Sequence, residues 1–486
     1  MKANRTGLCA LFALALLAGC VPSDIRPSAT AADSLAAGSA IAHAAPGEWP
    51  RADWWRAYGD PQLDALIAHA IADNPRLALA ADRIRAAQIG VNGARALMQP
   101  GLRFEASSIH THFSENEVFP PPLGGGDFWD NTAQFALSYD LDLWGRDEQN
   151  LRAALASAQL ASYEQRAAQL ALAGAVVRTY IELALQFELQ DNQRAILDDE
   201  RQTLDIAKRR YAAGIGTELE TQEIAVEIAA TRAELEQVAL RIATLRDSLG
   251  ALSGGGPAVG ETIARPALKL DAVAALPSTL PADLVGRRPD VVAERWRIER
   301  AADLIGVAKA RFYPNINLRA FAGVVSFGFA KLFDATSETV GAGPALSVPI
   351  FDGGTLRAGL EAQTAAYDAA LHSYNATVLD ALTDVSTQLT ALTALQRVRD
   401  ERSGALAAAT RANELAVKAF RAGLTDSLNV LHTQTVESSQ RSALASVNAQ
   451  RLAHWAALNQ ALGGGLVAAD ETDVAVREQP KQGAAR

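Results

Sequence analysis

Two histidines and two glycine triplets are the first candidates in this sequence for a metal site and a phosphate-binding loop. His110 and His112 are two positions apart, so in a strand both imidazoles would lie on one face, which permits a metal site. No clear acidic or cysteine partner accompanies them, and we interpret them as polar residues of a lumen or a loop end. The triplets Gly254–Gly256 and Gly463–Gly465 lack the Lys and Ser or Thr of a phosphate-binding loop. No spaced Ser, His and Asp set stands out, so the sequence favours a protein that is not an enzyme, with no cofactor and no metal.

The cysteine at position 20 has a different chemistry. Lys2 and Arg5 precede an apolar run, Leu8 to Ala18, that is too short to cross a bilayer, which needs about 20 helical residues. The run leads into Leu17-Ala18-Gly19-Cys20, which resembles the bacterial lipobox, where the cysteine is acylated and becomes the new N-terminus. We therefore expect residues 1–19 to be a lipoprotein signal peptide and Cys20 to be lipidated. The alternative is an ordinary secretory signal with an incidental cysteine.

The residues after Cys20 suggest where the lipoprotein goes. Val21 stands where an aspartate often retains lipoproteins in the inner membrane, so the outer membrane is favoured. Cys9 is removed with the signal, which leaves no free thiol in the mature chain. Residues 22–46 are rich in Ala, Ser and Pro, and we expect residues 20–59 to form a lipidated N-terminal tether.

Composition limits the remaining possibilities. The chain has 486 residues, 49% apolar and 21% charged, which excludes a disordered chain, and its two cysteines exclude a disulfide-stapled domain. The net charge is -10 and no block of five or more like charges occurs, so nothing predicts nucleic-acid binding. Abundant Ala, Leu, Glu, Gln and Arg predict long, closely packed helices. No segment after the signal has 18 consecutive apolar residues, so a later membrane crossing would need β-barrel strands.

The body of the chain repeats one unit twice. Three pairs of similar segments share one offset of 209 positions, as in 137 and 346, 214 and 423, and 254 and 463. The pairs are Leu137–Leu143 with Leu346–Asp352, Arg210–Gly216 with Ala419–Thr425, and Leu249–Gly256 with Leu458–Gly465. A constant offset over this length indicates a tandem duplication. We expect a first repeat over residues 60–256, a linker over 257–279, a second repeat over 280–465 and a C-terminal tail over 466–486.

Each repeat has the same predicted order of elements. A helix (61–97, or 290–312) precedes two strands, at about 101–112 and 131–143 in the first repeat and about 315–329 and 341–351 in the second. A very long helix follows, 146–212 or 355–421, and a glycine turn separates it from a returning helix that ends at the glycine triplet. At 1.5 Å per residue the long helix measures about 100 Å, which suits a structure that crosses an aqueous compartment. The fold class is therefore mainly α with a smaller β part.

The predicted strands alternate in polarity. Phe135, Leu137 and Leu141 fall on one face and Gln134 and Asp140 on the other. Segments of about 10 residues can cross a bilayer when tilted. The alternative is the half-buried strands of a soluble sandwich, which the lipoprotein signal and the long helices disfavour.

The number of strands implies an oligomer. One chain has four amphipathic strands, a membrane barrel needs at least about eight, and an open sheet edge is not tolerated in lipid. Two copies would give eight strands, whose barrel is filled by side chains, whereas three copies would give twelve and leave a lumen. For a conduit, a trimer is favoured.

Five stretches in order carry a resemblance to a known family. They are Trp54-Trp55-Arg56-Ala57-Tyr58-Gly59-Asp60-Pro61-Gln62-Leu63-Asp64, Leu137-Ser138-Tyr139-Asp140-Leu141-Asp142-Leu143-Trp144-Gly145-Arg146, Arg287-Arg288-Pro289-Asp290-Val291-Val292-Ala293-Glu294, Ile305 to Pro314, and Pro349-Ile350-Phe351-Asp352-Gly353-Gly354. With them, residues 45–465 resemble the outer membrane factors of the TolC type, in particular the NodT-like lipoproteins that serve efflux systems.

This resemblance implies a homotrimer in the outer membrane of a Gram-negative bacterium. Its twelve-stranded β-barrel would continue into an α-helical barrel that extends through the periplasm. The far end would dock a periplasmic adaptor protein fed by an inner-membrane efflux pump, expected to be of the resistance-nodulation-division type. In the family the two helix-turn-helix tips close the tunnel and carry the docking surface, and they correspond here to about 210–223 and 420–432.

The resemblance assigns the tip residues individually, and the chain departs from the family at some of them. The expected gate and docking residues are Arg210, Tyr211, Gly214, Glu218, Glu220, Phe420, Arg421, Gly423, Asp426, Asn429 and His432. Where the family usually has aspartate six residues after each tip glycine, this chain has Glu220 and the neutral Asn429, and Phe420 replaces an aromatic hydroxyl. We hypothesise that Glu218, Glu220 and Asp426 disfavour anions at closed tips and that His432 adds pH sensitivity. The alternative is a solvated cluster of helix-end charges.

Two classes of function remain. The first is a passive exit duct for small molecules or drugs delivered by a pump, with a duct for type I protein secretion or for metal ions as its alternative. The second is a non-conducting structural envelope lipoprotein. The amphipathic strands favour the duct, because a scaffold has no use for them.

Overall fold

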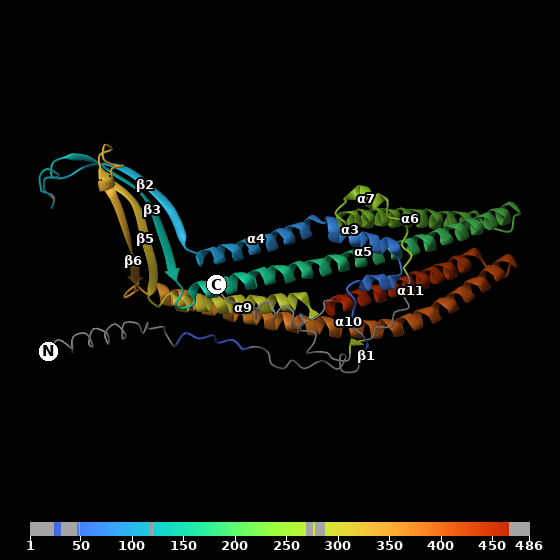
Figure 1. Cartoon of the computed structure of the whole chain (residues 1–486). Coiled ribbons are helices and arrows are strands. Elements are labelled where there is room, and N and C mark those ends of the chain that lie inside the picture. Colours follow the sequence, from blue (N-terminus) through green and yellow to red (C-terminus); the bar gives the residue numbers. More distant parts are fainter. Residues whose placement is uncertain are drawn as a thin grey trace. The chain divides into compact units, whose positions relative to one another are not determined.

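The computed structural model describes residues 24–30, 46–47, 49–116, 118, 120–268, 276–277 and 287–465. Within them the chain is mainly helical with one four-stranded antiparallel sheet (Figure 1), which confirms the expected fold class. The expected signal peptide, Cys20 and the tail 466–486 lie outside the described residues. The described chain forms two compact units: residues 24–30, 83–161 and 294–374 belong to the first, and residues from 46–82, 162–293 and 375–465 to the second.

The two repeats have matching elements, listed here in chain order. The first has α3 (Pro61–Asp73), α4 (Pro75–Leu97), β2 (Gly101–His112), β3 (Asp127–Leu141), α5 (Arg146–Ala212) and α6 (Glu218–Leu252); the second has α9 (Pro289–Ala310), β5 (Asn315–Phe327), β6 (Glu338–Ser347), α10 (Thr355–Arg421) and α11 (Ser427–Ala461). Helices α5 and α10 both have 67 residues, and α6 and α11 both have 35. These equal lengths confirm the internal duplication.

Minor elements complete the description. They are β1 (Pro46–Gly47), which pairs in parallel with β4 (Leu276–Pro277), the 3-10 helices η1 (Trp54–Tyr58) and η2 (Ala335–Ser337), and the short helix α7 (Pro257–Glu261). Helix α7 lies inside the expected linker, so the start of that linker is helical.

The first predicted helix, 61–97, is broken into α3 and α4. Asn74 is extended, with φ -72 and ψ 121, because the ring of the following Pro75 disfavours the helical conformation there. The Asn74 side chain accepts a hydrogen bond from the Arg76 amide (2.9 Å) and donates one to the Leu252 carbonyl (2.8 Å). The prediction of one unbroken helix was therefore wrong at this position, because the proline interrupts it.

The strand ends also differ from the expected ones. Strand β3 begins at Asp127 rather than 131, because β2 continues to His112 and pairs with it. It ends at Leu141 rather than 143, because Asp142 turns to cap the next helix. Strand β6 covers Glu338–Ser347 rather than 341–351, and its first residue pairs with Val324.

Part of the expected tether is packed. In the second unit, Trp54 and Tyr58 of η1 are buried, and Tyr58 donates a hydrogen bond to the Leu452 carbonyl (2.8 Å). The ring of Trp455 lies 5.3 Å from that of Tyr58. The expected tether bounds, residues 20–59, therefore include aromatic residues that pack in the core of this unit.

The core of the second unit surrounds one polar network. Asp60 caps α3 by accepting from the Gln62 amide (3.0 Å), and its other oxygen accepts from the Tyr180 hydroxyl and the Ala267 amide, both at 2.7 Å. The Gln62 side chain also donates to Tyr180 (2.7 Å) and pairs with the backbone of Ala264. Because burial raises the pKa of Tyr180, the phenol stays a donor to the carboxylate. The network ties α3, α5 and the segment after α7 together.

The glycine triplets follow the ends of α6 and α11, and in both places a glycine packs closely against a backbone carbonyl. Gly254 and Gly463 have φ of 82° and 91°, a conformation that glycine adopts at little cost. A Cβ at Gly254 would overlap the carbonyl of Asp73, and one at Gly463 the carbonyl of Arg287. Both carbonyls lie two residues before the proline that begins the next helix of each repeat, so the duplication extends to this packing.

Helix α5 has a stretch that is long and apolar enough to cross a membrane by length and composition, with mean hydropathy 1.3. Its Val176, Val177 and Tyr180 are fully buried in the core of the second unit. Core helices pass the same test, and packing accounts for the apolar content here.

Candidate functional site

One face of the four-stranded sheet is apolar and exposed. The order is β2-β3-β5-β6, and directly paired residues of antiparallel strands share a face. Leu102 pairs with Leu137, and Phe104 with Phe135, whose rings are 5.1 Å apart. Phe135 pairs in turn with Ala322. Leu102 is 68% exposed and Phe104 60%, so this face is solvent-accessible in the single chain.

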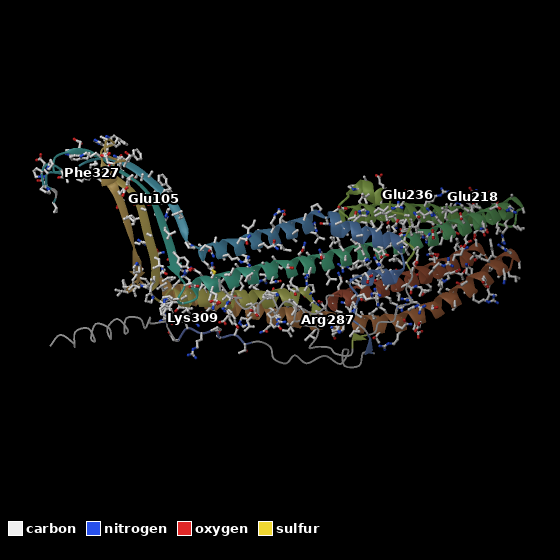
Figure 2. The ribbon with its side chains drawn as sticks, viewed as in Figure 1. Glu105, Glu218, Glu236, Arg287, Lys309 and Phe327 are labelled. Atoms are coloured by element: carbon white, nitrogen blue, oxygen red, sulfur yellow. The ribbon has the colours of Figure 1, made fainter. Side chains whose placement is uncertain are left out.

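The opposite face is more polar over the same levels, although it also carries Phe321, which pairs with Ala136. Arg103 and Glu105 form an ion pair at 3.3 Å, and Glu105 pairs in register with Gln134. Ser138 pairs with Arg319 on this face. Figure 2 shows the strand that carries Glu105. The sheet is therefore amphipathic, as alternation predicted, and can separate an apolar from a polar environment.

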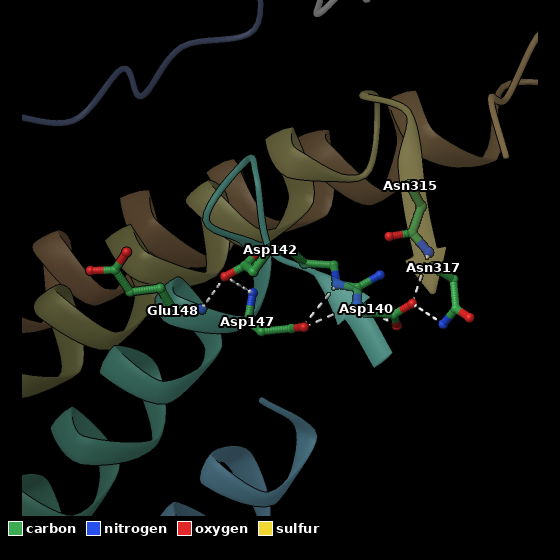
Figure 3. A network of polar contacts seen from close by, with 7 residues as sticks. Asp140, Asp142, Asp147, Glu148, Asn315 and Asn317 are labelled. Carbon is green, nitrogen blue, oxygen red and sulfur yellow. Dashed lines mark hydrogen bonds and ion pairs between the residues drawn. The ribbon is translucent and has the colours of Figure 1, made fainter. Parts of the chain in front are cut away.

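A network of carboxylates and one arginine caps α5 at the end of β3 (Figure 3). Asp142 accepts hydrogen bonds from the amides of Asp147 (3.1 Å) and Glu148 (2.8 Å), which are free donors in the first turn of a helix. Arg146 bridges Asp147 (2.9 Å) and Asp140 (3.3 Å).

Strand β5 completes the same network. Asn315 and Asn317 both donate to Asp140. The Trp144 ring stacks on that of Tyr313 at 4.7 Å, and its Nε1 donates to the carbonyl of Pro314 (2.7 Å). Two of the stretches that carry the family resemblance thus meet where the strands become helices.

The second repeat caps α10 in an analogous way. Asp352 accepts from the amides of Gly354 (3.0 Å) and Leu356 (2.6 Å). These hydrogen bonds hold the pKa of Asp352 below its ordinary value, the Leu356 amide contributing most. The Phe-Asp-Gly-Gly stretch therefore begins a helix.

The α5–α6 tip and the α10–α11 tip have turns of the same conformation. Gly214 and Gly423 both have φ 73°. The amide of the following residue, Ile215 or Leu424, donates to the carbonyl of Arg210 or Ala419 at 3.0 and 2.9 Å. Thr217 then caps α6 and Asp426 caps α11, accepting from the amides of Glu220 (3.2 Å) and Asn429 (3.0 Å).

A cation–π contact joins the two tips. The guanidinium carbon of Arg210 lies 5.2 Å from the centre of the Phe420 ring. Phe420 is 2% exposed and packs with Ile206, Ala416 and Val430. The side chain that replaces an aromatic hydroxyl is thus buried beneath an arginine of the other tip.

The remaining predicted tip residues differ in surroundings. Tyr211, Glu218, Arg421, Asn429 and His432 are exposed, and Figure 2 shows Glu218 beside the α5–α6 turn. Glu220 is half-buried, and its Oε1 has no hydrogen-bond partner among the described residues. The Asn429 side chain donates to the Thr425 hydroxyl at 3.3 Å.

His110 and His112 share a face of β2, as spacing predicted. The His110 ring lies 5.1 Å from that of Trp129, and His112 contacts Asp127 at 3.1 Å. Over the described residues, no three or more His, Cys, Asp or Glu side chains are grouped to hold a metal ion.

Comparison with models of known protein families identifies the family of this chain. A model of the outer membrane efflux protein family matches residues 66–255 and 280–464, one match for each repeat. The chain belongs to this family. It is an outer-membrane efflux protein, and its fold is that of channel proteins.

Individual relatives agree with this membership. The chain is 42% identical to the fusaric acid resistance protein FusA of Burkholderia cepacia, over 72% of this chain and 67% of that protein. It is 29% identical to the multidrug resistance outer membrane protein MdtP of Escherichia coli K12, over 87% and 88%. The crystal structure of the outer membrane protein VceC of Vibrio cholerae superposes with a TM-score of 0.80 and 31% identity, covering 86% of this chain and all of VceC.

Sequence reasoning missed two features of the tips. Thr217 stands three positions before Glu220, a capping-box spacing that identifies a helix start. Ile215, Leu219, Leu424 and Leu428 are 51 to 81% exposed, and the repeat offset pairs Ile215 with Leu424 and Leu219 with Leu428. The turn glycines predict where the tips are, but only the structure shows that these four apolar side chains are exposed there.

Proposed function

We propose that three copies of this chain form a continuous exit duct through the outer membrane and the periplasm. The amphipathic sheet with two open edges carries the proposal. Among the described strands, β2 and β6 each have a neighbour on one side only. The strands alternate in direction, so β6 of one copy can pair antiparallel with β2 of the next. Three copies would close a twelve-stranded barrel with its apolar face toward lipid and a lumen inside.

The membrane anchor and the partners belong to the same proposal. Cys20 would be acylated and hold each copy to outer-membrane lipid. A periplasmic adaptor would dock on the tips and receive cargo from an inner-membrane pump of the resistance-nodulation-division type. The exposed apolar side chains support adaptor docking at the tips. Each tip has one such pair, Ile215 with Leu219 or Leu424 with Leu428, which gives a partner an apolar surface to bind. The chain would act as a passive duct without catalysing a reaction.

Small organic molecules are the favoured cargo. The names of FusA and MdtP describe resistance to fusaric acid and to multiple drugs. These names favour drugs and organic acids over the alternatives of type I protein secretion and metal-ion efflux. A non-conducting envelope lipoprotein would leave the exposed apolar sheet face without a use.

We further propose that the tip carboxylates affect which ions pass. Glu218 is exposed beside the turn and is free to act on the pore, whereas Asp426 also caps α11. Replacing Glu218 or Glu220 by glutamine keeps the turn and removes charge. Reduced cation preference of single channels in a planar bilayer supports the proposal, and unchanged selectivity contradicts it. The same recordings at pH 5.5 and 7.5, with His432→Gln, test the pH sensitivity.

A matched pair of substitutions tests the orientation of the sheet. Ala322 lies on the apolar face, opposite Phe135, and Ala136 lies on the polar face, opposite Phe321. Ala322→Arg puts a charge toward lipid, at a cost of about 2–4 kcal/mol per copy near the bilayer centre. We expect it to abolish membrane trimers, as measured by native mass spectrometry and bilayer conductance.

Ala136→Arg is the control. It adds the same side chain on the lumen face, so trimers should form and conduct with altered selectivity. Equal loss in both variants would refute this orientation of the sheet, and lone subunits from the unmodified protein would refute the duct.

A further inference from the structure

Three phenylalanine rings lie together at one end of the four-stranded sheet. Phe113 directly follows β2, Phe128 is the second residue of β3, and Phe327 is the last residue of β5. The ring centres are 6.1 Å apart for Phe113 and Phe128, 6.0 Å for Phe113 and Phe327, and 5.8 Å for Phe128 and Phe327. Each ring therefore contacts the other two, and together they form one aromatic surface. We call these three rings the aromatic platform.

The strand register places the platform on the more polar face of the sheet. Phe128 pairs with Thr111, which lies on the same face of β2 as Glu105, because successive residues of a strand alternate between faces. Phe327 pairs with Asp130, two positions after Phe128, so its ring lies on that face as well. The third ring contacts both of the others. The platform therefore belongs to the face that the proposed barrel turns toward its lumen.

The platform lies at the end of the strands that is not joined to helices. Helix α4 leads into the opposite end of β2, and α5 follows the opposite end of β3. Figure 2 shows Phe327 at this end of the sheet. In the proposed duct the helices extend into the periplasm, so this end of the strands is the outer mouth. Cargo would pass the platform last.

One carboxylate lies on the same face beside the rings. Asp130 is opposite Phe327 in the register and two positions from Phe128 along β3. It has no ion-pair partner within the part of the chain that the structure describes. The cation-forming side chain of His112 pairs with Asp127 on the opposite face, at 3.1 Å, and so does not neutralise Asp130. The charge beside the platform is therefore negative.

The rings are accessible to a ligand. Phe327 is 50% exposed, and Phe113 and Phe128 are half-buried in the single chain. The face of an aromatic ring carries partial negative charge, so it attracts cations as well as other rings. A nearby carboxylate adds to the attraction for a cation and opposes an anion. Rings and carboxylate together fit a ligand that is both aromatic and positively charged.

We propose that the aromatic platform and Asp130 form an exit site that binds aromatic cations at the outer mouth. The aromatic part of the ligand packs on the rings, and its positive charge lies near the carboxylate. An aliphatic cation would lose the ring contacts, and an aromatic anion would be repelled by Asp130, so organic acids would pass without being held. Three such sites would surround the mouth of a trimer. This inference rests on the proposed duct.

Blocking of single channels in a planar bilayer measures binding at this site. N-methylquinolinium, an aromatic cation, is added on the side of the outer mouth and compared with naphthalene-1-sulfonate, an aromatic anion, and with tetraethylammonium, an aliphatic cation. The aromatic cation should block the current for longer than either. Phe327→Leu removes one ring and keeps apolar bulk, and it should shorten the blocks about fivefold, the change that ~1 kcal/mol of cation–π contact corresponds to. Asp130→Asn should reduce the difference between cation and anion.

Two matched variants control for the position of the ring and of the charge. Phe135→Leu removes a ring from the opposite face, and Glu105→Gln removes a carboxylate from the same face nearer the helices. Both should leave the blocks by N-methylquinolinium unchanged. Equal blocking by the aromatic anion, or blocks that Phe327→Leu does not shorten, would overturn the proposal. A cluster that only stabilises the loop would change blocking by cation and anion alike, and that result would overturn it too.

A binding measurement separates failure of the platform from failure of the duct. Equilibrium dialysis of N-methylquinolinium against the purified full-length protein needs no conductance. Binding that both Phe327→Leu and Asp130→Asn weaken would support the platform even if no channel conducted, and only the duct would be refuted. Conducting channels without such binding would overturn the platform and leave the duct. If Phe327→Leu yields no trimers, Phe113→Leu removes another ring of the same surface and replaces it in both experiments.

Discussion

The contact between Arg210 and Phe420 predicts a measurable coupling between the two tips. The ring is almost fully buried and the guanidinium lies 5.2 Å from its centre. Cation–π contacts contribute from ~0.5 kcal/mol when exposed to ~2 kcal/mol when desolvated. Arg210 is half-buried, so we take about 1 kcal/mol, which corresponds to a roughly fivefold change in a local opening equilibrium.

A double-mutant cycle read by hydrogen exchange measures this coupling. Phe420→Leu keeps the apolar bulk and removes the ring, and Arg210→Gln removes the charge. The amides of Gly423 and Leu424, which donate to Phe420 and Ala419, report opening of the α10–α11 turn. Arg210→Gln should speed their exchange about fivefold alone and not at all in the Phe420→Leu background.

The adjacent arginine provides the control for charge alone. Arg421 is exposed at the end of α10, and Arg421→Gln should leave the turn amides unchanged. If Arg210→Gln acts equally in both backgrounds, the guanidinium is not acting through the ring, and the reasoning is refuted.

Three further predictions concern the caps and the core. Because the pKa of Asp352 is lower in the folded chain, its carboxylate stabilises the start of α10 above the pKa of the unfolded chain and loses this effect as the pH falls through the folded pKa. Hydrogen-exchange protection of the Leu356 amide should therefore hold from pH 7 to about pH 5 and fall at lower pH. Asp352→Asn should abolish this pH dependence. Tyr180→Phe leaves Asp60 short of a buried donor and should destabilise the second unit by about 1–3 kcal/mol in thermal unfolding, more than Tyr163→Phe. Gly463→Ala should prevent trimer accumulation, because a Cβ there overlaps the Arg287 carbonyl, whereas Gly404→Ala on open helix surface should be tolerated.

Much of the fold follows from the sequence because its signals are periodic and repeated. The offset of 209 predicted the ends of the long helices, since a turn glycine recurs at the same place, Gly214 in one repeat and Gly423 in the other. The two-residue period of the strands predicted the face of each side chain, and the observed register agrees with it, because a slip by one would turn Phe104 or Phe135 to the polar face.

Contacts between distant segments could not be predicted in the same way. Nothing in the local pattern around Asp368 announces that Ser28 will dock there, since the two are 340 positions apart. Arg210 and Phe420 lie at the ends of different helices, where periodicity gives the face of a residue and not its partner. The break at Asn74 has a local cause that the prediction of one helix over 61–97 did not use, because the proline after Asn74 disfavours a helical backbone there.

The duplication also has a limit, and the tips show where it lies. The offset that pairs Gly214 with Gly423 also pairs Tyr211 with Phe420, yet Tyr211 is 50% exposed and Phe420 2%. The equivalent of Arg210 is Ala419, so only one tip can supply the cation that covers the ring. The exposed pairs Ile215 with Leu219 and Leu424 with Leu428 remain equivalent. An adaptor touching only the apolar pairs would therefore meet six similar tips in a trimer, whereas one that reached the Arg210–Phe420 contact would distinguish two sets of three.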